Sequence, residues 1–242
     1  MSTRARRLSM SILVLIVLVS IYLFVHSSFF NINKIYVTGL KAITADEVTA
    51  LAGIKTGTNI FEINRDVCAG AIKIHPMVKQ ATIVRHYPRT IEIRIAERKM
   101  WAVIPYPEGY ACVDNQGVCL DRVKSIDITK YPLITLDKLP ARINLGQPVN
   151  ADAVHMIKKI YDALGENSNQ ISEFHYLNED EGIIIYTIAG TQVKFGNLDR
   201  LDEKIKFFPQ IFNLEKDLQT KEHEVLQYVD LRYKGEPVIK TR

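Results

Sequence analysis

Hydrophobic residues divide the chain into an unbroken apolar stretch near the N-terminus and a long region of mixed apolar and polar residues. The apolar stretch, residues 10–25, carries only two serines and one tyrosine hydroxyl, and no charged residue lies between Arg7 and Lys34. Extended over residues 8–30, it would form a helix of about 35 Å. Crossing a bilayer takes about 20 residues. The pattern therefore predicts a membrane anchor over residues 9–30.

The charges in front of this stretch predict its orientation. Arg4, Arg6 and Arg7 precede it, and positive residues stay on the cytoplasmic side. We expect a short cytoplasmic tail, residues 1–8, and an extracytoplasmic remainder. A cleaved signal peptide is the alternative, with a cleavage site near Val25-His26-Ser27, although the apolar run is long for one. A buried core helix is disfavoured because the run is apolar all round.

The next region alternates between strand and helix patterns. The predicted elements are a strand over 31–39, a helix after Thr44, a helix over 64–74 and strands over 78–84 and 91–97. Thr44 and Glu47 have the spacing of a capping box, and Gly53 ends that helix. In the second helix, Val67, Ala71, Ile72 and Ile74 are the expected apolar positions. Pro76 follows its end.

The strand over 91–97 has a clear period of two. Ile91, Ile93 and Ile95 are expected to face the core, and Glu92 and Arg94 to face water. The region thus has the order β-α-α-β-β, with a small core of its own.

The pattern of the C-terminal region predicts an antiparallel sheet with helices packed beside it. The expected strands are residues 100–104, 110–113, 118–120, 171–177, 182–188, 191–195, 225–233 and 238–240, and the expected helices are 151–164 and 198–214. The fold class is therefore α+β.

Composition and charge exclude several classes of protein. The 242 residues have a formal charge of +4. Without the three N-terminal arginines the remainder is nearly neutral, whereas a nucleic-acid binder usually carries a basic face. Three cysteines are too few for a disulfide scaffold. Cys68 is expected in a helix core. Cys112 and Cys119 flank the turn at 114–117, and either a cross-strand disulfide or two free thiols fits them; zinc would need a second ligand pair.

No catalytic set emerges from the sequence. None of the six histidines forms H-x-x-x-H or H-E-x-x-H, and both the nucleophile elbow and the phosphate-loop motif are missing. The run Glu179-Asp180-Glu181 is typical of a solvated acidic turn, with a cation site as the less favoured interpretation. We expect no enzymatic activity, no cofactor and no metal.

Two groups of motifs resemble the FtsQ/DivIB cell-division family. The first is Pro76 and Val78 opening a strand, Arg85 and Pro88 at the turn, and Glu97 closing the next strand; Met77 and Tyr87 replace two usual tryptophans. This stretch is similar to a POTRA domain.

The second group lies in the C-terminal region. It comprises Val113-Asp114 with Gly117, the element Gly190 to Gly196 with Phe195 for the usual Leu, and Asp230-Leu-Arg-Tyr233 with Gly235 and Val238. Pro237 departs from the pattern and puts the start of the last strand in doubt, because proline cannot donate to a ladder.

The resemblance implies a non-enzymatic, single-pass scaffold of the inner membrane at the division septum. Its parts would be the anchor, a POTRA domain over 31–99 and a β domain over 100–242. The last strands would form an exposed edge that accepts a partner strand. The partner-binding residues would be Arg232, Tyr233, Gly235, Val238 and Ile239. Asp230 and Arg232 share a strand face, which favours a structural ion pair.

The resemblance also implies partners: small bitopic coiled-coil division proteins of the FtsB/DivIC and FtsL type, with no nucleic acid. The alternative function is a POTRA-containing component of polypeptide transport or envelope assembly, although such proteins usually carry several POTRA repeats or a barrel. An anchored envelope hydrolase is a third hypothesis, which lacks a catalytic set.

Overall fold

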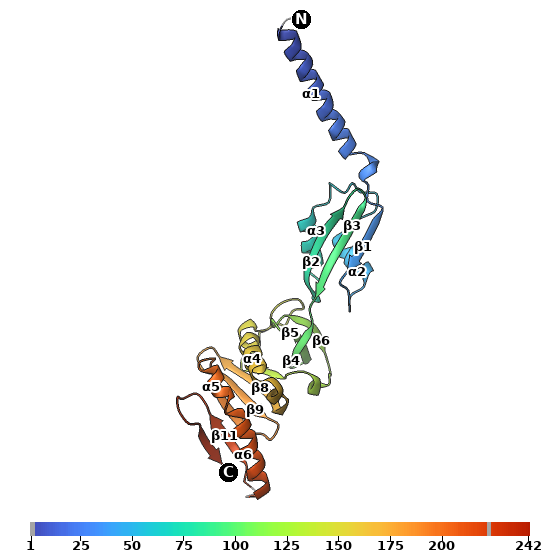
Figure 1. Cartoon of the computed structure of the whole chain (residues 1–242). Coiled ribbons are helices and arrows are strands. Elements are labelled where there is room, and N and C mark those ends of the chain that lie inside the picture. The colour runs from blue at the N-terminus through green and yellow to red at the C-terminus, as the bar shows by residue number, and fades with distance from the viewer. Residues whose placement is uncertain (1–2, 222–223) are drawn as a thin grey trace. The chain divides into compact units, whose positions relative to one another are not determined.

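The structure is a computed structural model that describes residues 3–221 and 224–242, without the side chains of residues 3–6, 8 and 221 (Figure 1). The first two residues of the predicted tail, 1–8, therefore lie outside the described residues. The chain forms two compact units, Met1–Arg98 and Lys99–Arg242. Each unit is described separately below.

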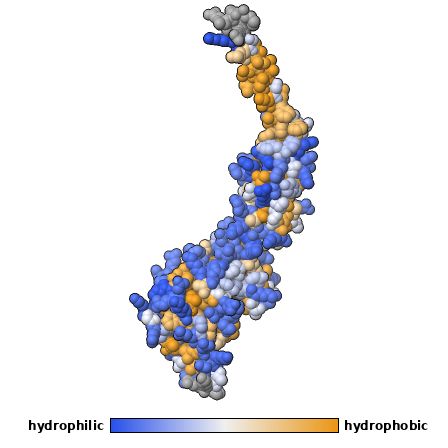
Figure 2. Space-filling view, viewed as in Figure 1, coloured by the Kyte–Doolittle hydropathy of each residue, from blue (hydrophilic) through white to orange (hydrophobic). Residues whose placement is uncertain are grey.

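The first unit begins with helix α1, Thr3–Val25. The helix ends five residues before the predicted end of the anchor. The Ser27 hydroxyl donates to the Phe24 carbonyl at 2.7 Å, and the chain then turns into the short helix η1, Ser28–Phe30. The apolar side chains of α1 are exposed (Figure 2). Counting only the described residues, no helix combines the length and the hydropathy of a membrane span.

The rest of this unit confirms the predicted β-α-α-β-β order. Its elements are β1 (Lys34–Thr38), α2 (Ala45–Ala52), α3 (Arg65–Ile72), β2 (Val78–His86) and β3 (Thr90–Glu97). The strand order is β1-β3-β2; β1 runs parallel to β3, and β2 runs antiparallel to it.

Local chemistry explains these boundaries. Thr44 and Glu47 form the predicted capping box, and Gly53 ends α2 with a φ of 65°. Asn64 caps α3. The carboxylate of Glu97, at the end of β3, accepts backbone N–H groups of residues 41–43, which fixes the loop after β1.

Two predictions about exposure in this unit are wrong. Val67 and Ile74 are exposed, since Ile72 is the residue through which α3 reaches the core. Glu92 is only 7% exposed, although it lies on the sheet face opposite the isoleucines. Side chains from neighbouring strand positions cover its carboxylate: His86 at 2.7 Å and Arg94 at 2.9 Å. These contacts, Arg94 first, lower the pKa of Glu92 to about 2.

The second unit contains two sheets. The smaller, β4-β5-β6, consists of Met100–Tyr106, Gly109–Asp114 and Cys119–Val123. The larger has the order β12-β11-β10-β9-β8-β7. Its strands are β7 (Ile134–Leu136), β8 (Ile171–Asn178), β9 (Gly182–Thr187), β10 (Gln192–Gly196), β11 (Leu226–Asp230) and β12 (Val238–Thr241). The prediction of an antiparallel sheet is wrong for two strand pairs of this sheet, because β7 runs parallel to β8 and β10 runs parallel to β11. The remaining elements are η2 (Ile128–Lys130), α4 (Ala151–Leu164), η3 (Gly165–Gln170), α5 (Leu201–Ile205) and α6 (Phe208–Lys221).

One hydrophobic core joins the helices to the sheets. The fully buried Phe174, Phe195 and Phe208 come from β8, β10 and α6, and Ile157 and Ile160 come from α4. The three cysteines are free thiols. Burial raises the pKa of the Cys119 thiol to about 11, so it is an inert apolar side chain.

The helix predicted over residues 198–214 is two helices, α5 and α6. Pro209 explains the break, because it has no N–H to donate to the preceding turn, whereas a proline is tolerated in the first turn of a new helix. The second helix also continues to Lys221, beyond the predicted end.

Candidate functional site

The C-terminal strand β12 is the outermost strand of the large sheet. It pairs antiparallel with β11, and no strand within the described residues lies on its other side. All four of its residues are exposed; the side chains of Val238 and Ile239 are 53% and 50% exposed. The strand begins directly after Pro237, so that departure from the family pattern does not prevent it.

The hydrogen bonds of the ladder decide which backbone groups of β12 remain free. Arg242 and Val225 exchange both N–H···O bonds at 3.0 Å, so the backbone of Arg242 faces β11. Backbone groups alternate along an antiparallel strand. The N–H and C=O groups of Ile239 and Thr241 therefore face outward, where a further strand would pair.

The turn between β11 and β12 carries the other predicted site residues. The Arg232 guanidinium donates to the Asp230 carboxylate at 2.6 Å and 3.0 Å, which realises the predicted ion pair and lowers the pKa of Asp230. Tyr233 is 66% exposed, with the Arg232 guanidinium 5.7 Å from its ring centre. Gly235 has a φ of 108°, which few other residues adopt. The structure thus brings all five predicted residues to one sheet edge.

Arg200 is the residue of this edge that the sequence analysis missed. Its guanidinium donates to the backbone carbonyls of Leu231, Arg232 and Tyr233 at 3.4, 3.0 and 3.1 Å. Its own backbone is left-handed, with a φ of 50°. The predicted helix over 198–214 concealed it, because a residue inside a helix could not have this backbone.

A buried lysine holds the segment around Arg200 in place. The Lys204 ammonium is 1% exposed and donates to the Asn197 carbonyl at 3.0 Å and to Asp199 at 2.7 Å, above the ring of Phe195. The same contact lowers the pKa of Asp199. Two hydrogen bonds and the aromatic ring compensate the burial of this charge, so its role here is to position the loop.

Comparison with known proteins matches both units to one family. Residues 30–98 match the FtsQ-type POTRA domain, and residues 102–232 match the C-terminal domain of the cell division protein FtsQ/DivIB. The second match covers more than half of the chain. The chain belongs to the FtsQ/DivIB family of cell-division proteins.

Individual relatives agree with this assignment. The chain is 28% identical to the cell division protein FtsQ of Geotalea daltonii over 218 residues, which is 88% of this chain and 77% of the relative. It is 27% identical to the cell division protein DivIB of Clostridium acetobutylicum over 214 residues, 87% and 82% of the two chains. The polypeptide-transport alternative is therefore not favoured. The family match ends at residue 232, so β12 lies beyond it.

An apolar groove runs beside β12 in this FtsQ/DivIB family member. Its volume is about 350 Å³, and its lining includes Ile211 and Leu214 of α6, Val229 of β11 and Ile239 of β12. The side chain of Ile239 therefore lies on the helix side of the sheet, while its backbone N–H lies at the free edge. The edge offers both main-chain partners and an apolar surface.

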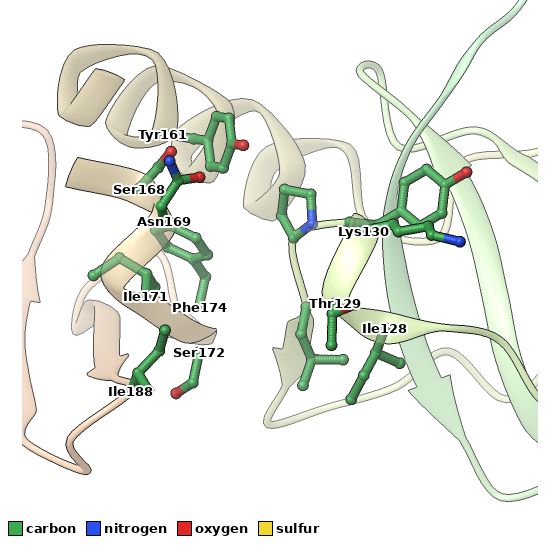
Figure 3. A pocket seen from close by; sticks show the side chains of 13 residues that line it. Ile128, Thr129, Lys130, Tyr161, Ser168, Asn169, Ile171, Ser172, Phe174 and Ile188 are labelled. Carbon is green, nitrogen blue, oxygen red and sulfur yellow. The ribbon is translucent and has the colours of Figure 1, made fainter. Parts of the chain in front are cut away.

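A second cavity, of about 370 Å³, contains none of the predicted site residues (Figure 3). It lies between the segment around Ile128 and the start of β8, and its lining includes Ile171, Phe174 and Ile188. It has no carboxylate, histidine or cysteine in its walls. Across the described part of the chain, no group of three His, Cys, Asp or Glu side chains could hold a metal ion.

Proposed function

We propose that this chain is a non-enzymatic scaffold of the cell-division machinery that accepts a partner strand at β12. The observation that carries the proposal is the free edge itself, in which Ile239 and Thr241 direct backbone groups outward. Main-chain hydrogen bonds supply affinity in this mode, and neighbouring pockets supply selectivity. The groove against α6 supplies such a pocket.

Each of the five predicted residues has a role in this proposal. Ile239 pairs with the partner backbone and adds an apolar side chain at the groove, and Val238 offers its exposed side chain to the partner beside it. Tyr233 contacts the partner beside the strand. Gly235 permits the turn. Arg232 holds the turn through Asp230 rather than through the partner, because its guanidinium is already paired.

The proposed partners are small bitopic coiled-coil division proteins of the FtsB/DivIC and FtsL type, together with other division proteins. Family membership supports a partner from the division machinery, and the edge supports one with an extended segment. An unpaired edge is otherwise an aggregation hazard, which is a physical reason to expect an occupant.

We also propose that α1 anchors the chain in the inner membrane at the septum, with residues 1–8 cytoplasmic and both units outside. Support comes from the uncharged stretch between Arg7 and Lys34 and from the exposed apolar side chains of α1. The domains would then be the POTRA domain, 31–99, and the β domain, 100–242.

The decisive test is proline at the free edge. Ile239→Pro removes an outward N–H and places a ring where the partner backbone would lie, whereas proline is tolerated on edge strands. One lost hydrogen bond costs about 1 kcal/mol, and the added clash should raise the Kd at least about tenfold. The binding probe is the extracytoplasmic segment of the FtsB/DivIC-type protein from the same bacterium, titrated by calorimetry.

Ile239→Ala is the matched control, because it shortens the same side chain but keeps the N–H. We expect it to weaken binding less than Ile239→Pro. Circular dichroism of both variants checks the fold. Unchanged binding by the proline variant would overturn strand addition at β12 and leave family membership intact.

A further inference from the structure

Five aromatic rings form a continuous cluster where α1 meets the POTRA domain. Phe24 lies 5.2 Å from Phe30, Phe30 lies 5.0 Å from Phe61, and Phe61 lies 5.3 Å from Tyr87, measured between ring centres. Phe29 contacts both Phe24 and Phe30. The cluster therefore joins the helix, the η1 turn, the loop after α2 and the turn between β2 and β3.

Most of this cluster is exposed to solvent in the isolated chain. Phe29, Phe61 and Tyr87 are 53%, 39% and 58% exposed. Only Phe30 packs against the POTRA core. Exposed aromatic residues gathered at one place mark an interaction surface rather than a core.

The cluster is attached firmly to the end of α1. The Asn59 side chain is buried, and its Nδ2 donates to the Val25 carbonyl at 2.8 Å. Its Oδ1 accepts the N–H of Phe61 at 3.0 Å. One amide therefore links the last residue of the helix to the loop that carries an exposed ring.

Basic residues lie on the loops that carry these rings. Arg89, two residues after Tyr87, is exposed, and its Nε donates to the Asn31 carbonyl at 3.0 Å. Arg85 contacts the Phe61 and Ile63 carbonyls. Glu62 is the exposed acidic residue of the same loop. Aromatic rings beside basic side chains are the composition of protein segments at a membrane–water interface.

We infer that this end of the POTRA domain sits in the lipid headgroup layer, with Phe29, Phe61 and Tyr87 at the level of the interface. The inference rests on the proposed anchoring by α1. The occupant is a phospholipid surface because the ring contacts of Phe24 with Phe29 and Phe30 continue the apolar surface of α1 into the cluster.

Tryptophan fluorescence tests this placement. Trp101, the single tryptophan, is first replaced in Trp101→Phe. Phe61→Trp then reports on the cluster, and Ile74→Trp, at an exposed position just after α3, is the matched control. Leu15→Trp reports on α1. Each full-length variant is reconstituted in phosphatidylcholine–phosphatidylglycerol vesicles with or without bromine on the acyl chains.

We expect Phe61→Trp to show blue-shifted emission and loss of intensity with brominated lipid, and Ile74→Trp to show neither. If Leu15→Trp is quenched but Phe61→Trp behaves like Ile74→Trp, the anchor stands and the interfacial placement is overturned. If Leu15→Trp is not quenched either, the anchoring proposal fails and this inference fails with it.

Discussion

The two edges of the six-stranded sheet are built in opposite ways. β7 has three residues, and the segment before it joins the smaller sheet through a bridge between Leu133 and Val103 and a 3.0 Å hydrogen bond from the Val103 N–H to the Pro132 carbonyl. β12 has four exposed residues and, among the described residues, no neighbour on its outer side.

This difference shows how one sheet combines stability with binding. Covering an edge prevents unwanted pairing, and the contacts of residues 132 and 133 with β4 cover the start of the β7 edge. At β12, Arg200 and the Asp230–Arg232 pair instead fix the turn that leads into the strand. The outer side of the strand stays free. An edge that is held firmly but not covered is suited to accept a strand at low entropic cost.

The largest expected effect comes from deleting the β12 edge. A separate variant at the β7 edge serves as the comparison. A chain ending at Arg232 lacks β12 and should bind the FtsB/DivIC-type segment at least about 100-fold more weakly, because the main-chain partners are gone. Asp137→Arg, an exposed charge reversal just after β7, should leave the Kd unchanged. Calorimetry measures both.

Since the truncation also exposes β11, thermal unfolding must show that the shortened chain still folds. Equal affinity of the truncated and full chains would place the partner away from β12. A loss caused by Asp137→Arg would instead favour the β7 edge.

An intermediate effect is expected for Arg200→Ala. The substitution removes the donor to three carbonyls of the turn, and hydrogen bonds from charged groups contribute about 1.5–3 kcal/mol each at most. We expect about 2–3 kcal/mol lower stability and a Kd raised about tenfold. Chemical denaturation and calorimetry measure the two quantities.

Lys206→Ala is the control for lost charge nearby, because Lys206 is an exposed cation just after α5. It should change neither quantity. If Arg200→Ala lowers stability without changing affinity, the turn supports the fold but not the binding edge.

The smallest expected effect is a pH dependence of the β12 edge. Hydrogen bonds from Arg232 lower the pKa of Asp230 in the folded state, whereas the unfolded value is about 3.9. The stabilisation is therefore complete above about pH 4 and is lost as the pH falls through the lower folded pKa. The protection factors of the β12 amides, which compare the measured exchange rate with the intrinsic rate at the same pH, should fall on acidification in this range.

Asp230→Asn should show faster exchange at neutral pH and a flatter response to acid than the natural chain. Asp180→Asn, at an exposed turn, serves as the control. An acid response that is the same in Asp230→Asn and the natural chain would mean that another group controls this edge.

The sequence by itself determined most of the elements and their order, but not the break between α5 and α6 or the short strand β7. Local signals carried this information: the Thr44–Glu47 capping box, Gly53 after α2, and the period of two at Ile91, Ile93 and Ile95. These signals depend on neighbours within a few residues, so they can be read from the chain directly. The motif order also identified the family before any contact was known.

Only the tertiary structure decided the environment of individual side chains. The Thr38 hydroxyl of β1 donates to the buried Glu92 carboxylate at 3.2 Å, and Arg200 holds the C-terminal turn because residues 231–233 fold back beside it. Such contacts join positions far apart in the sequence, so no local pattern encodes them. For the same reason, the pairing of β12 with β11, which directs the Ile239 backbone outward, had to come from the folded sheet.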